Sequence, residues 1–398
     1  MKILVINAGS SSLKYQLFDM EKETVLAKGN CQKIGIKGSF ITHKYGSNST
    51  KIEMELKNHD EAMQKVLSLL TSGEFGVIKS LNEISAVGQR VLHGGEIYKD
   101  SVLVTDEVMK NLELLKPLGP LHMPANISGI VACQKILPSA PQVAVFDTAF
   151  HANMPKEAFL YAIPYEAYED WRIRRYGFHG TSHKFVSGEA AKLLGKDLKD
   201  AKIITVHLGN GSSVAAVSGG HSIDTSMGFT PLEGLIMGTR SGDVDASVVS
   251  FIAEKLDLRG DEIAQYFNKK CGALGISGVS SDMMDINEAS ENGNERAKLV
   301  VPMMAHRIKK YIGAYAALLN GVDAIVFTGG IGENQADLRE LSLSNMEYLG
   351  VEFDEEKNNN LPRGTVEEIS KPNSRVKVFR IPTDEELVIA RDTLNLIK

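Results

Sequence analysis

The chain has 398 residues, 43% hydrophobic and 24% charged, which is the composition of a soluble globular protein and enough for two domains. A net charge of -6 disfavours general binding to nucleic acid or to a membrane surface. The three cysteines have no CxxC spacing, which disfavours a disulfide framework or a zinc site. No apolar run approaches the roughly 20 residues of a membrane helix, and a strand begins at once with Ile3, leaving no room for a signal peptide. We therefore expect a cytoplasmic protein with reduced thiols.

The N-terminal part of the chain has the pattern of an α/β lobe. Residues 2–20 are expected to form a β-hairpin, followed by further strands to about residue 57 and a helix over Asp60–Leu70, whose apolar residues share one face. A short strand from residue 85 runs into a glycine turn at 94–95, and another strand, from 142, ends on Asp147. Chemistry in α/β enzymes lies at the carboxyl ends of such strands.

A second lobe begins near residue 151. We expect a second hairpin over 202–218, a glycine-rich stretch over 228–242 and a long helical segment from about 297 to 319. A buried strand from Asp323 then leads through a glycine turn into a helix, and a last helix over 384–397 has Thr383 as N-cap and Glu386 completing a capping box. The predicted domains are residues 1–150 with 384–398, and residues 151–383.

Two segments half a chain apart repeat one pattern. Residues 2–14, KILVINAGSSSLK, and residues 202–214, KIITVHLGNGSSV, each consist of an apolar strand, a turn of small residues and a second strand. Turns of Asn, Gly and Ser let backbone N–H groups approach an anion closely. Two such turns facing each other would hold a polyphosphate, so the repeat favours duplicated lobes with a cleft between them and a phosphoryl-transfer enzyme.

Other constellations fit that interpretation. Glycines 329, 330 and 332 follow an apolar strand and precede a helix, which suits a nucleotide but equally suits a tight turn. Arg90 and Arg240 border glycine-rich turns, where an arginine can hold a carboxylate or a phosphoryl group, although a lone arginine is more often a surface residue. The widely spaced Asn7, Asp147 and Glu385 are candidates for a Mg2+ shell.

The whole chain resembles the acetate kinases, a short-chain acyl kinase family within the superfamily of acetate and sugar kinases, heat-shock ATPases and actin. The resemblance is carried, in order, by the segments at 7–14, 93–95, 146–151, 176–183, 207–212, 224–228, 238–240 and 329–334. It implies an α/β, duplicated ribonuclease-H-like (actin-like ATPase) fold of two lobes, with ATP in a central cleft, and a homodimer. The implied activity is phosphorylation of acetate to acetyl phosphate.

The resemblance also implies roles for individual residues. Arg90 and Arg240 would hold the carboxylate and the transferring phosphoryl group, His179 would stabilise that group in flight, Asp147 would orient the reacting groups, and His122 would belong to the same pocket. Asn7 and Glu385 would position Mg2+ (or Mn2+). The pocket for the acyl group would be lined by Leu92, Leu121, Phe178 and Pro231. The nucleotide, ATP or ADP, would be bound by Lys14, His207, Leu208, Gly209, Asn210, Gly211, Asp282, Met283, Met284, Gly330, Ile331, Gly332, Glu333 and Asn334.

The sequence departs from the family's usual pattern at Met123, Ala246 and Met284, where Asn, Pro and Arg are usual. The third departure concerns the segment that would contact the nucleoside. The alternatives are a propionate or butyrate kinase of the same family, a sugar kinase, which would need a general base for its alcohol nucleophile, and a nucleotide-dependent binding module, which would leave the two arginines and His179 without a task.

Overall fold

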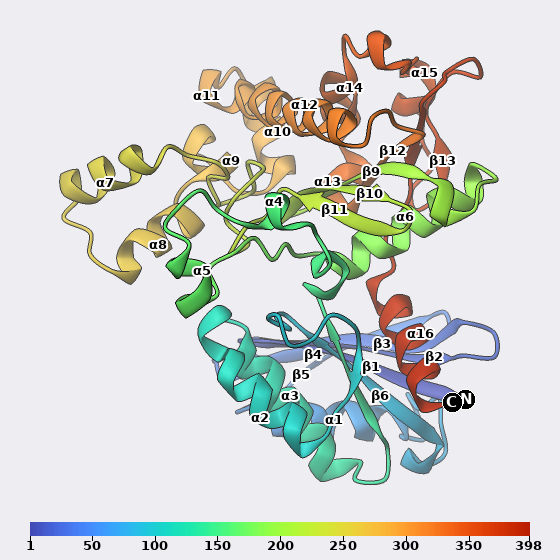
Figure 1. Cartoon of the computed structure of the whole chain (residues 1–398). Helices are drawn as coiled ribbons and strands as arrows, with labels where there is room; N and C mark the ends of the chain where they lie inside the picture. Colours follow the sequence, from blue (N-terminus) through green and yellow to red (C-terminus); the bar gives the residue numbers. More distant parts are fainter. The chain divides into compact units, whose positions relative to one another are not determined.

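The computed structural model describes all 398 residues, which pack as two compact units (Figure 1). Unit 1 consists of Met1–Ala152 and Asp384–Lys398, and unit 2 consists of Asn153–Thr383. No helix in either unit combines the length and the apolar character needed to cross a bilayer. All three cysteines are free thiols, as expected.

Unit 1 is built on an eight-stranded mixed sheet with the order β5-β4-β3-β2-β1-β6-β8-β7. Strands β1 to β5 form an antiparallel meander, and β6 and β8 then run parallel to β1. The strands are β1 (Lys2–Gly9), β2 (Ser12–Asp19), β3 (Thr24–Gln32), β4 (Phe40–Tyr45), β5 (Asn48–Glu53), β6 (Ile84–Val91), β7 (Val102–Leu103) and β8 (Gln142–Phe146).

Helices cover both faces of this sheet because successive residues of β1 point to opposite faces. Leu4 and Ile6 share a core with α1 (His59–Leu70) and α3 (Met123–Ile136), whereas Ile3 and Val5 share another with α16 (Glu385–Ile397). Helix α2 (Asp106–Leu115) packs beside α3. The close approach of α16 to β6 depends on Gly88, where a Cβ atom would lie 2.6 Å from side-chain atoms of Ile389 and Thr393. The end of the chain, red in Figure 1, thus completes the unit that the beginning of the chain, in blue, builds.

Unit 2 repeats the same topology in a six-stranded sheet with the order β11-β10-β9-β12-β14-β13. Its strands are β9 (Lys202–Leu208), β10 (Ser212–Ser218), β11 (His221–Thr225), β12 (Ala324–Thr328), β13 (Glu367–Glu368) and β14 (Lys377–Arg380). Strands β9, β10 and β11 form the antiparallel meander, and β12 and β14 run parallel to β9, as β6 and β8 do to β1. The predicted duplicated ribonuclease-H-like fold is therefore confirmed.

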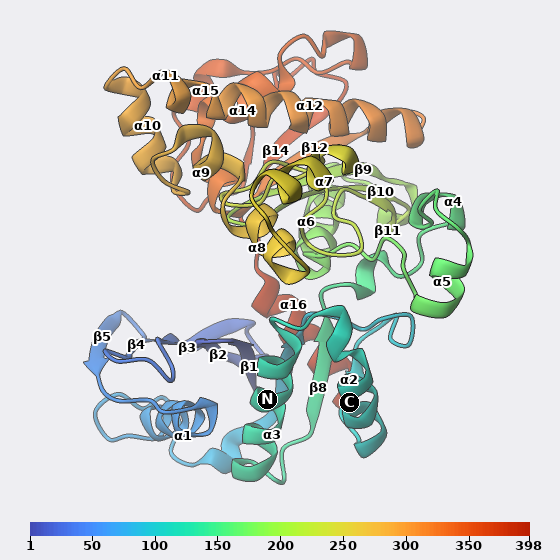
Figure 2. The same ribbon diagram turned by 90° about the vertical axis from the view of Figure 1, so that its left-hand side faces the viewer.

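Two helices of unit 2 flank its sheet. Helix α12 (Val300–Leu318) packs on β9 and β10 and shares a core with Val206, while α6 (Gly180–Leu193) contacts β9 and β12. Figure 2 shows α12 beside α14 (Ala336–Leu343). The other helices are α4 (Lys156–Phe159), α5 (Glu166–Trp171), α7 (Ala246–Lys255), α8 (Asp261–Lys269), α9 (Gly272–Ser277), α10 (Met283–Glu291), α11 (Glu295–Lys298), α13 (Gly329–Asn334) and α15 (Glu355–Asn359).

One local prediction is wrong, and another differs from the structure at one end. The N-cap of α16 is Asp384, whose carboxylate accepts the Leu387 N–H at 2.9 Å, whereas the Thr383 hydroxyl is buried without a hydrogen-bond partner. The predicted helix from about 297 to 319 is confirmed as α12, which begins at Val300, and the residues before it belong to the separate short helix α11. Pro302 explains the division, because it has no N–H to donate to the carbonyl of Lys298 in a continuous helix.

Candidate active site

In unit 1 the parallel strands β1, β6 and β8 bring their carboxyl ends to one edge of the sheet. Ile6 pairs with Gln89, and Arg90 pairs with Val145, so Asn7, Arg90 and Asp147 follow one another along that edge. This is the position at which α/β sheets bind ligands.

Arg90 and Asp147 form a bidentate ion pair at this edge. The Nε and Nη2 atoms of Arg90 donate to Oδ1 and Oδ2 of Asp147 at 2.9 and 2.8 Å. The Glu385 carboxylate, at the start of α16, lies 3.7 Å from the same Nη2. Asp147 is only 2% exposed, against 26% for Arg90. The pair uses two of the five N–H donors of the guanidinium, so Arg90 retains donors for an anionic substrate.

The pKa values in this cluster reflect burial and the close pair. Burial raises the pKa of Asp147, and the Arg90 guanidinium acts in the opposite direction. Burial acts to lower the pKa of Arg90, but the carboxylates of Asp147 and Glu385 outweigh it and raise that pKa above its usual range. Arg90 is therefore a permanent cation held in place by a buried partner.

The other predicted residues of unit 1 differ in their exposure. His122 immediately precedes α3, is exposed, and acts to lower the pKa of Asp147. Leu92 is partly buried and packs beside Met123 over Gly119, but Leu121 is 66% exposed. Lys14 is exposed and pairs with Asn7 in the β1–β2 ladder.

Sequence reasoning missed Asn126, which connects two of these strand ends. Its Oδ1 accepts the N–H of Leu92 at 2.9 Å, and its Nδ2 donates to the carbonyl of Ala8 at 2.7 Å. It is buried, so both bonds are protected from water. Asn126 thereby holds the end of β6, which carries Arg90, against the end of β1, which carries Asn7. In this part of the sequence we identified His122, four residues earlier, as the candidate site residue. Nothing in the local sequence marks an asparagine within a helix as part of a site.

In unit 2 two histidines stack beside the turn that joins β9 and β10. The rings of His179 and His207 lie 4.3 Å apart, centroid to centroid, with 25° between their planes. A Cβ atom on Gly211, in the turn, would lie 3.1 Å from Nε2 of His179 and 3.4 Å from Nη1 of Arg240. Glycine therefore leaves a space there onto which an imidazole nitrogen and a guanidinium converge.

His179 has an unusual backbone, and hydroxyl groups support its ring. It occupies the left-handed region, with φ of 56°, directly before α6. Left-handed backbone is uncommon for residues other than glycine and is frequent at functional sites. Its Nδ1 lies 2.9 Å from the hydroxyl of Ser213, and Nδ1 of His207 lies 2.8 Å from that of Ser182.

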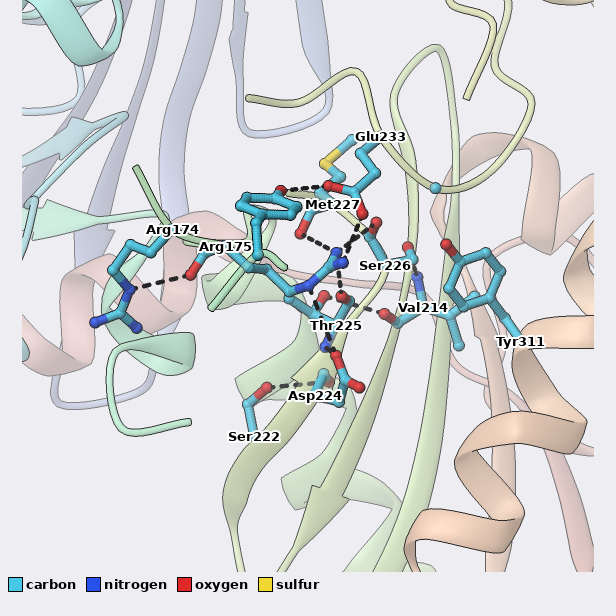
Figure 3. A network of polar contacts seen from close by, with 12 residues as sticks. Arg174, Arg175, Val214, Ser222, Asp224, Thr225, Ser226, Met227, Glu233 and Tyr311 are labelled. Atoms are coloured by element: carbon cyan, nitrogen blue, oxygen red, sulfur yellow. Dashed lines mark hydrogen bonds and ion pairs between the residues drawn. The ribbon is translucent and has the colours of Figure 1, made fainter. Parts of the chain in front are cut away.

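Arg240 is held by the loop that contains Pro231. Its Nη1 donates to the Pro231 carbonyl at 3.1 Å, and burial lowers its pKa. In the same unit, Arg175 donates to the carbonyls of Thr225, Ser226 and Met227 and forms a 2.5 Å ion pair with Glu233 (Figure 3).

Tyr161 donates to the same carboxylate through its hydroxyl, so Glu233 is clamped from two sides. Sequence reasoning also missed this network. Its members are ordinary polar residues until the fold brings them together.

The predicted nucleotide residues of unit 2 converge at the carboxyl ends of β9 and β12. Gly329 and Gly332 pack directly on Leu208, where a Cβ atom on Gly329 would lie 2.6 Å from the Leu208 carbonyl. A Cβ atom on Gly238 would lie 3.2 Å from the Ser281 carbonyl and 3.7 Å from Oδ1 of Asn210.

The flanking nucleotide candidates are placed by helices. Asp282 caps α10 through its carboxylate, and Met284, in the first turn of that helix, is 77% exposed. Glu333 and Asn334 lie in α13, and burial raises the pKa of Glu333. The turn, the glycines of α13 and the start of α10 thus form one group within unit 2.

The predicted site residues therefore form two groups, one in each unit. Arg90, Asp147 and Glu385 come together in unit 1, and His179, His207, Arg240 and Pro231 in unit 2. The predicted acyl pocket draws Leu92 and Leu121 from unit 1 and Phe178, which is buried, and Pro231 from unit 2. Lys14 is the one predicted nucleotide residue in unit 1. The roles of these residues stay predictions. No three His, Cys, Asp or Glu side chains gather in a metal-binding arrangement.

Comparison with known proteins identifies relatives along the entire chain. The model of the acetokinase family matches residues 2–391. An acetate kinase of Desulfitobacterium hafniense is 56% identical over 399 residues, covering all of both chains. Among solved structures, an acetate kinase of Porphyromonas gingivalis superposes with a TM-score of 0.96 at 49% identity, covering all of both chains. A propionate kinase of Francisella tularensis superposes with a TM-score of 0.92 at 41% identity, covering 99% of each.

Proposed function

The chain belongs to the acetokinase family, and we propose that it transfers the terminal phosphoryl group of ATP directly and reversibly to acetate, giving acetyl phosphate and ADP. The observation that carries the proposal is the convergence of His179 Nε2 and Arg240 Nη1 on the space above Gly211. An imidazole and a guanidinium beside a turn of glycine, asparagine and serine suit the oxygens of a transferring phosphoryl group.

The reaction requires little covalent chemistry from the protein. A carboxylic acid with a pKa of about 4–5 is already ionised at neutral pH, so the nucleophile needs no general base. Catalysis then reduces to aligning acetate with the phosphorus atom and neutralising charge. We assign the acetate carboxylate to Arg90, whose orientation Asp147 fixes, with His122 beside it. We assign the charge that develops on the phosphoryl oxygens to Arg240 and His179.

A divalent cation fits the oxygen donors of unit 1. Both oxygens of Asp147 accept from Arg90, whereas Glu385 lies 3.7 Å from it and presents its carboxylate at the same edge of the sheet as Asn7. We propose that Asn7 and Glu385 hold Mg2+ (or Mn2+), which keeps most of its coordination for water and phosphate oxygens. When bound, the ion would supply neutralisation of phosphate charge.

We also propose that the protein is a cytoplasmic homodimer. The dimer is what the family implies, and the cytoplasmic location is supported by the cysteines, all free, of which Cys31 and Cys133 are buried. Light scattering coupled to size-exclusion chromatography tests the dimer: a mass of about twice 43.4 kDa supports it, and the monomer mass contradicts it.

One assay separates the proposed function from its alternatives. ADP release is measured with ATP and Mg2+ in the presence of acetate, propionate, butyrate, a hexose or no acceptor. Fastest release with acetate supports the proposal. Faster release with propionate or butyrate indicates a propionate or butyrate kinase of the same family instead. Release that needs the hexose indicates a sugar kinase, and release that ignores every acceptor indicates a nucleotide-dependent binding module.

A further inference from the structure

A chain of buried side chains leads from the interior of unit 2 to His179. The hydroxyl of Thr205 lies 2.7 Å from Nδ1 of His183, and Nε2 of His183 lies 2.7 Å from the hydroxyl of Ser213. That hydroxyl is in turn 2.9 Å from Nδ1 of His179. Thr205, His183 and Ser213 are all 0% exposed.

The number of hydrogens restricts how such a chain can be arranged. A neutral imidazole donates from one nitrogen and accepts at the other, and a hydroxyl has a single hydrogen to donate. If Thr205 donates to Nδ1 of His183, then Nε2 of His183 carries a proton and donates to Ser213. Ser213 then donates to Nδ1 of His179, which leaves the proton of His179 on Nε2.

The geometry around Gly211 selects this direction. Nε2 of His179 borders the space above Gly211, and Arg240 reaches the same space. Phosphoryl oxygens only accept hydrogen bonds, so a proton on Nε2 attracts them and a lone pair on Nε2 repels them. The opposite direction, with the proton on Nδ1, would present that lone pair.

We propose that Ser213 and His183 are positioning residues that fix His179 as the tautomer protonated on Nε2, with Thr205 setting the direction of the chain. The inference rests on the proposed function, because the direction of the chain follows from assigning His179 to phosphoryl oxygens. The tautomer is nevertheless measured in the free protein, without the reaction.

Two further features support a fixed ring. His207 stacks on His179 and is itself held by Ser182, the neighbour of His183 in the first turn of α6. One helical turn therefore supports both rings. Ser213 is completely buried, so its hydroxyl is shielded from exchange of its two histidine partners for bulk water.

The tautomer is tested by nitrogen NMR of the whole protein with 15N-labelled histidine. The signals of His179 are identified by their loss in His179→Gln. We expect an unprotonated Nδ1 and a protonated Nε2 in the wild type. A proton on Nδ1, or a ring that averages between both tautomers, overturns the proposal, and the tautomer is read from the wild type, with His179→Gln used only to identify the signals.

Variants test the consequence. Ser213→Ala should lower kcat about 10- to 100-fold with little change in KM for ATP, because one hydrogen bond that orients a catalytic ring is lost. His183→Leu should do the same, whereas His183→Gln, which retains an amide donor near the position of Nε2, should recover most of the turnover. Ser187→Ala is the matched control, since Ser187 is a buried serine of α6 whose hydroxyl donates to the Lys184 carbonyl instead.

The outcomes separate the two proposals. If wild-type protein phosphorylates no acetate but His179 is protonated on Nε2, the proposed function fails and the hydrogen-bond chain stands. If the wild type is active and Ser213→Ala matches Ser187→Ala in kcat, the positioning role is wrong.

Discussion

Arg90 and Asp147 end neighbouring parallel strands and join through two hydrogen bonds of 2.9 and 2.8 Å, with the carboxylate almost completely buried. Arg240, the second arginine of the candidate site, has a backbone carbonyl as its partner instead. Removal of Arg90 therefore leaves a buried carboxylate without its ion-pair partner, whereas removal of Arg240 leaves a backbone carbonyl without that hydrogen bond.

We predict that Arg90→Ala and Arg240→Ala both lower turnover by roughly 100-fold or more, because each removes a group that faces developing or substrate charge. Arg90→Ala should also lower the free energy of unfolding by about 3–5 kcal/mol, since it strands a buried carboxylate. Steady-state acetyl phosphate formation, ADP binding and urea denaturation measure these quantities separately.

The control is the double variant Arg90→Ala/Asp147→Ala, which should regain part of the lost stability without regaining turnover. Lost nucleotide affinity with intact turnover in either single variant would refute the assignment of that arginine.

The second prediction concerns acceptor size. Leu92 is predicted to line the acyl pocket and packs beside Met123 over Gly119, so we expect propionate to be used poorly. One methylene in an apolar pocket contributes about 1–3 kcal/mol to discrimination, so propionate should be disfavoured but not excluded. Leu92→Ala should shift kcat/KM toward propionate or butyrate, and Leu114→Ala, at an exposed leucine of α2, should not. An unchanged acetate-to-propionate ratio in Leu92→Ala would show that Leu92 does not line the acyl pocket.

The third prediction concerns the choice of nucleotide. Met284 replaces the arginine usual in the family and is 77% exposed, so its side chain contributes no guanidinium to a purine. We expect similar kcat/KM values with ATP, GTP and ITP, and a stronger preference for one of them in Met284→Arg. A hundredfold preference of the wild type for ATP would show that residues other than the one at position 284 select the nucleotide.

The fourth prediction compares two neighbouring residues before α16. Asp384→Ala should lower stability by about 0.5–2 kcal/mol, because it removes the N-cap bond to Leu387. Thr383→Ala should cost less, since its hydroxyl makes no hydrogen bond. Urea denaturation of both variants decides between them, and a larger loss in Thr383→Ala would restore Thr383 as the cap.

The fifth prediction concerns thiol reactivity. Burial raises the pKa of Cys31 and of Cys133 to about 12, so at pH 8 only about one molecule in ten thousand carries either thiolate. Cys271 is only partly buried. A disulfide reagent should therefore modify one thiol of the native protein, lost in Cys271→Ser, and all three after denaturation. Rapid modification of two or more native thiols would contradict the burial of Cys31 and Cys133.

The repeated hairpins at 2–14 and 202–214 could be predicted because their information is local. Strand periodicity and turn residues within thirteen positions specify β1–β2 and β9–β10, and strand ends specify where Arg90 and Asp147 lie. Duplication of the pattern then predicted duplication of the fold. The break before α12 and the true cap of α16 were missed by one to a few residues, because helix ends depend on which nearby group reaches the first free N–H.

The partners of the site residues were decided only by the tertiary structure. Ser213 looks like any serine of a strand until the pairing of β9 with β10 and the packing of α6 place it between His179 and His183, 34 and 30 residues earlier. Glu233 likewise meets Arg175 and Tyr161 across 58 and 72 residues. The sequence by itself determined which strands and turns form and which residues could carry the chemistry. It did not determine which side chains hold those residues, because a hydrogen bond depends on strand register and helix packing to within a fraction of an ångström, and no local pattern records them.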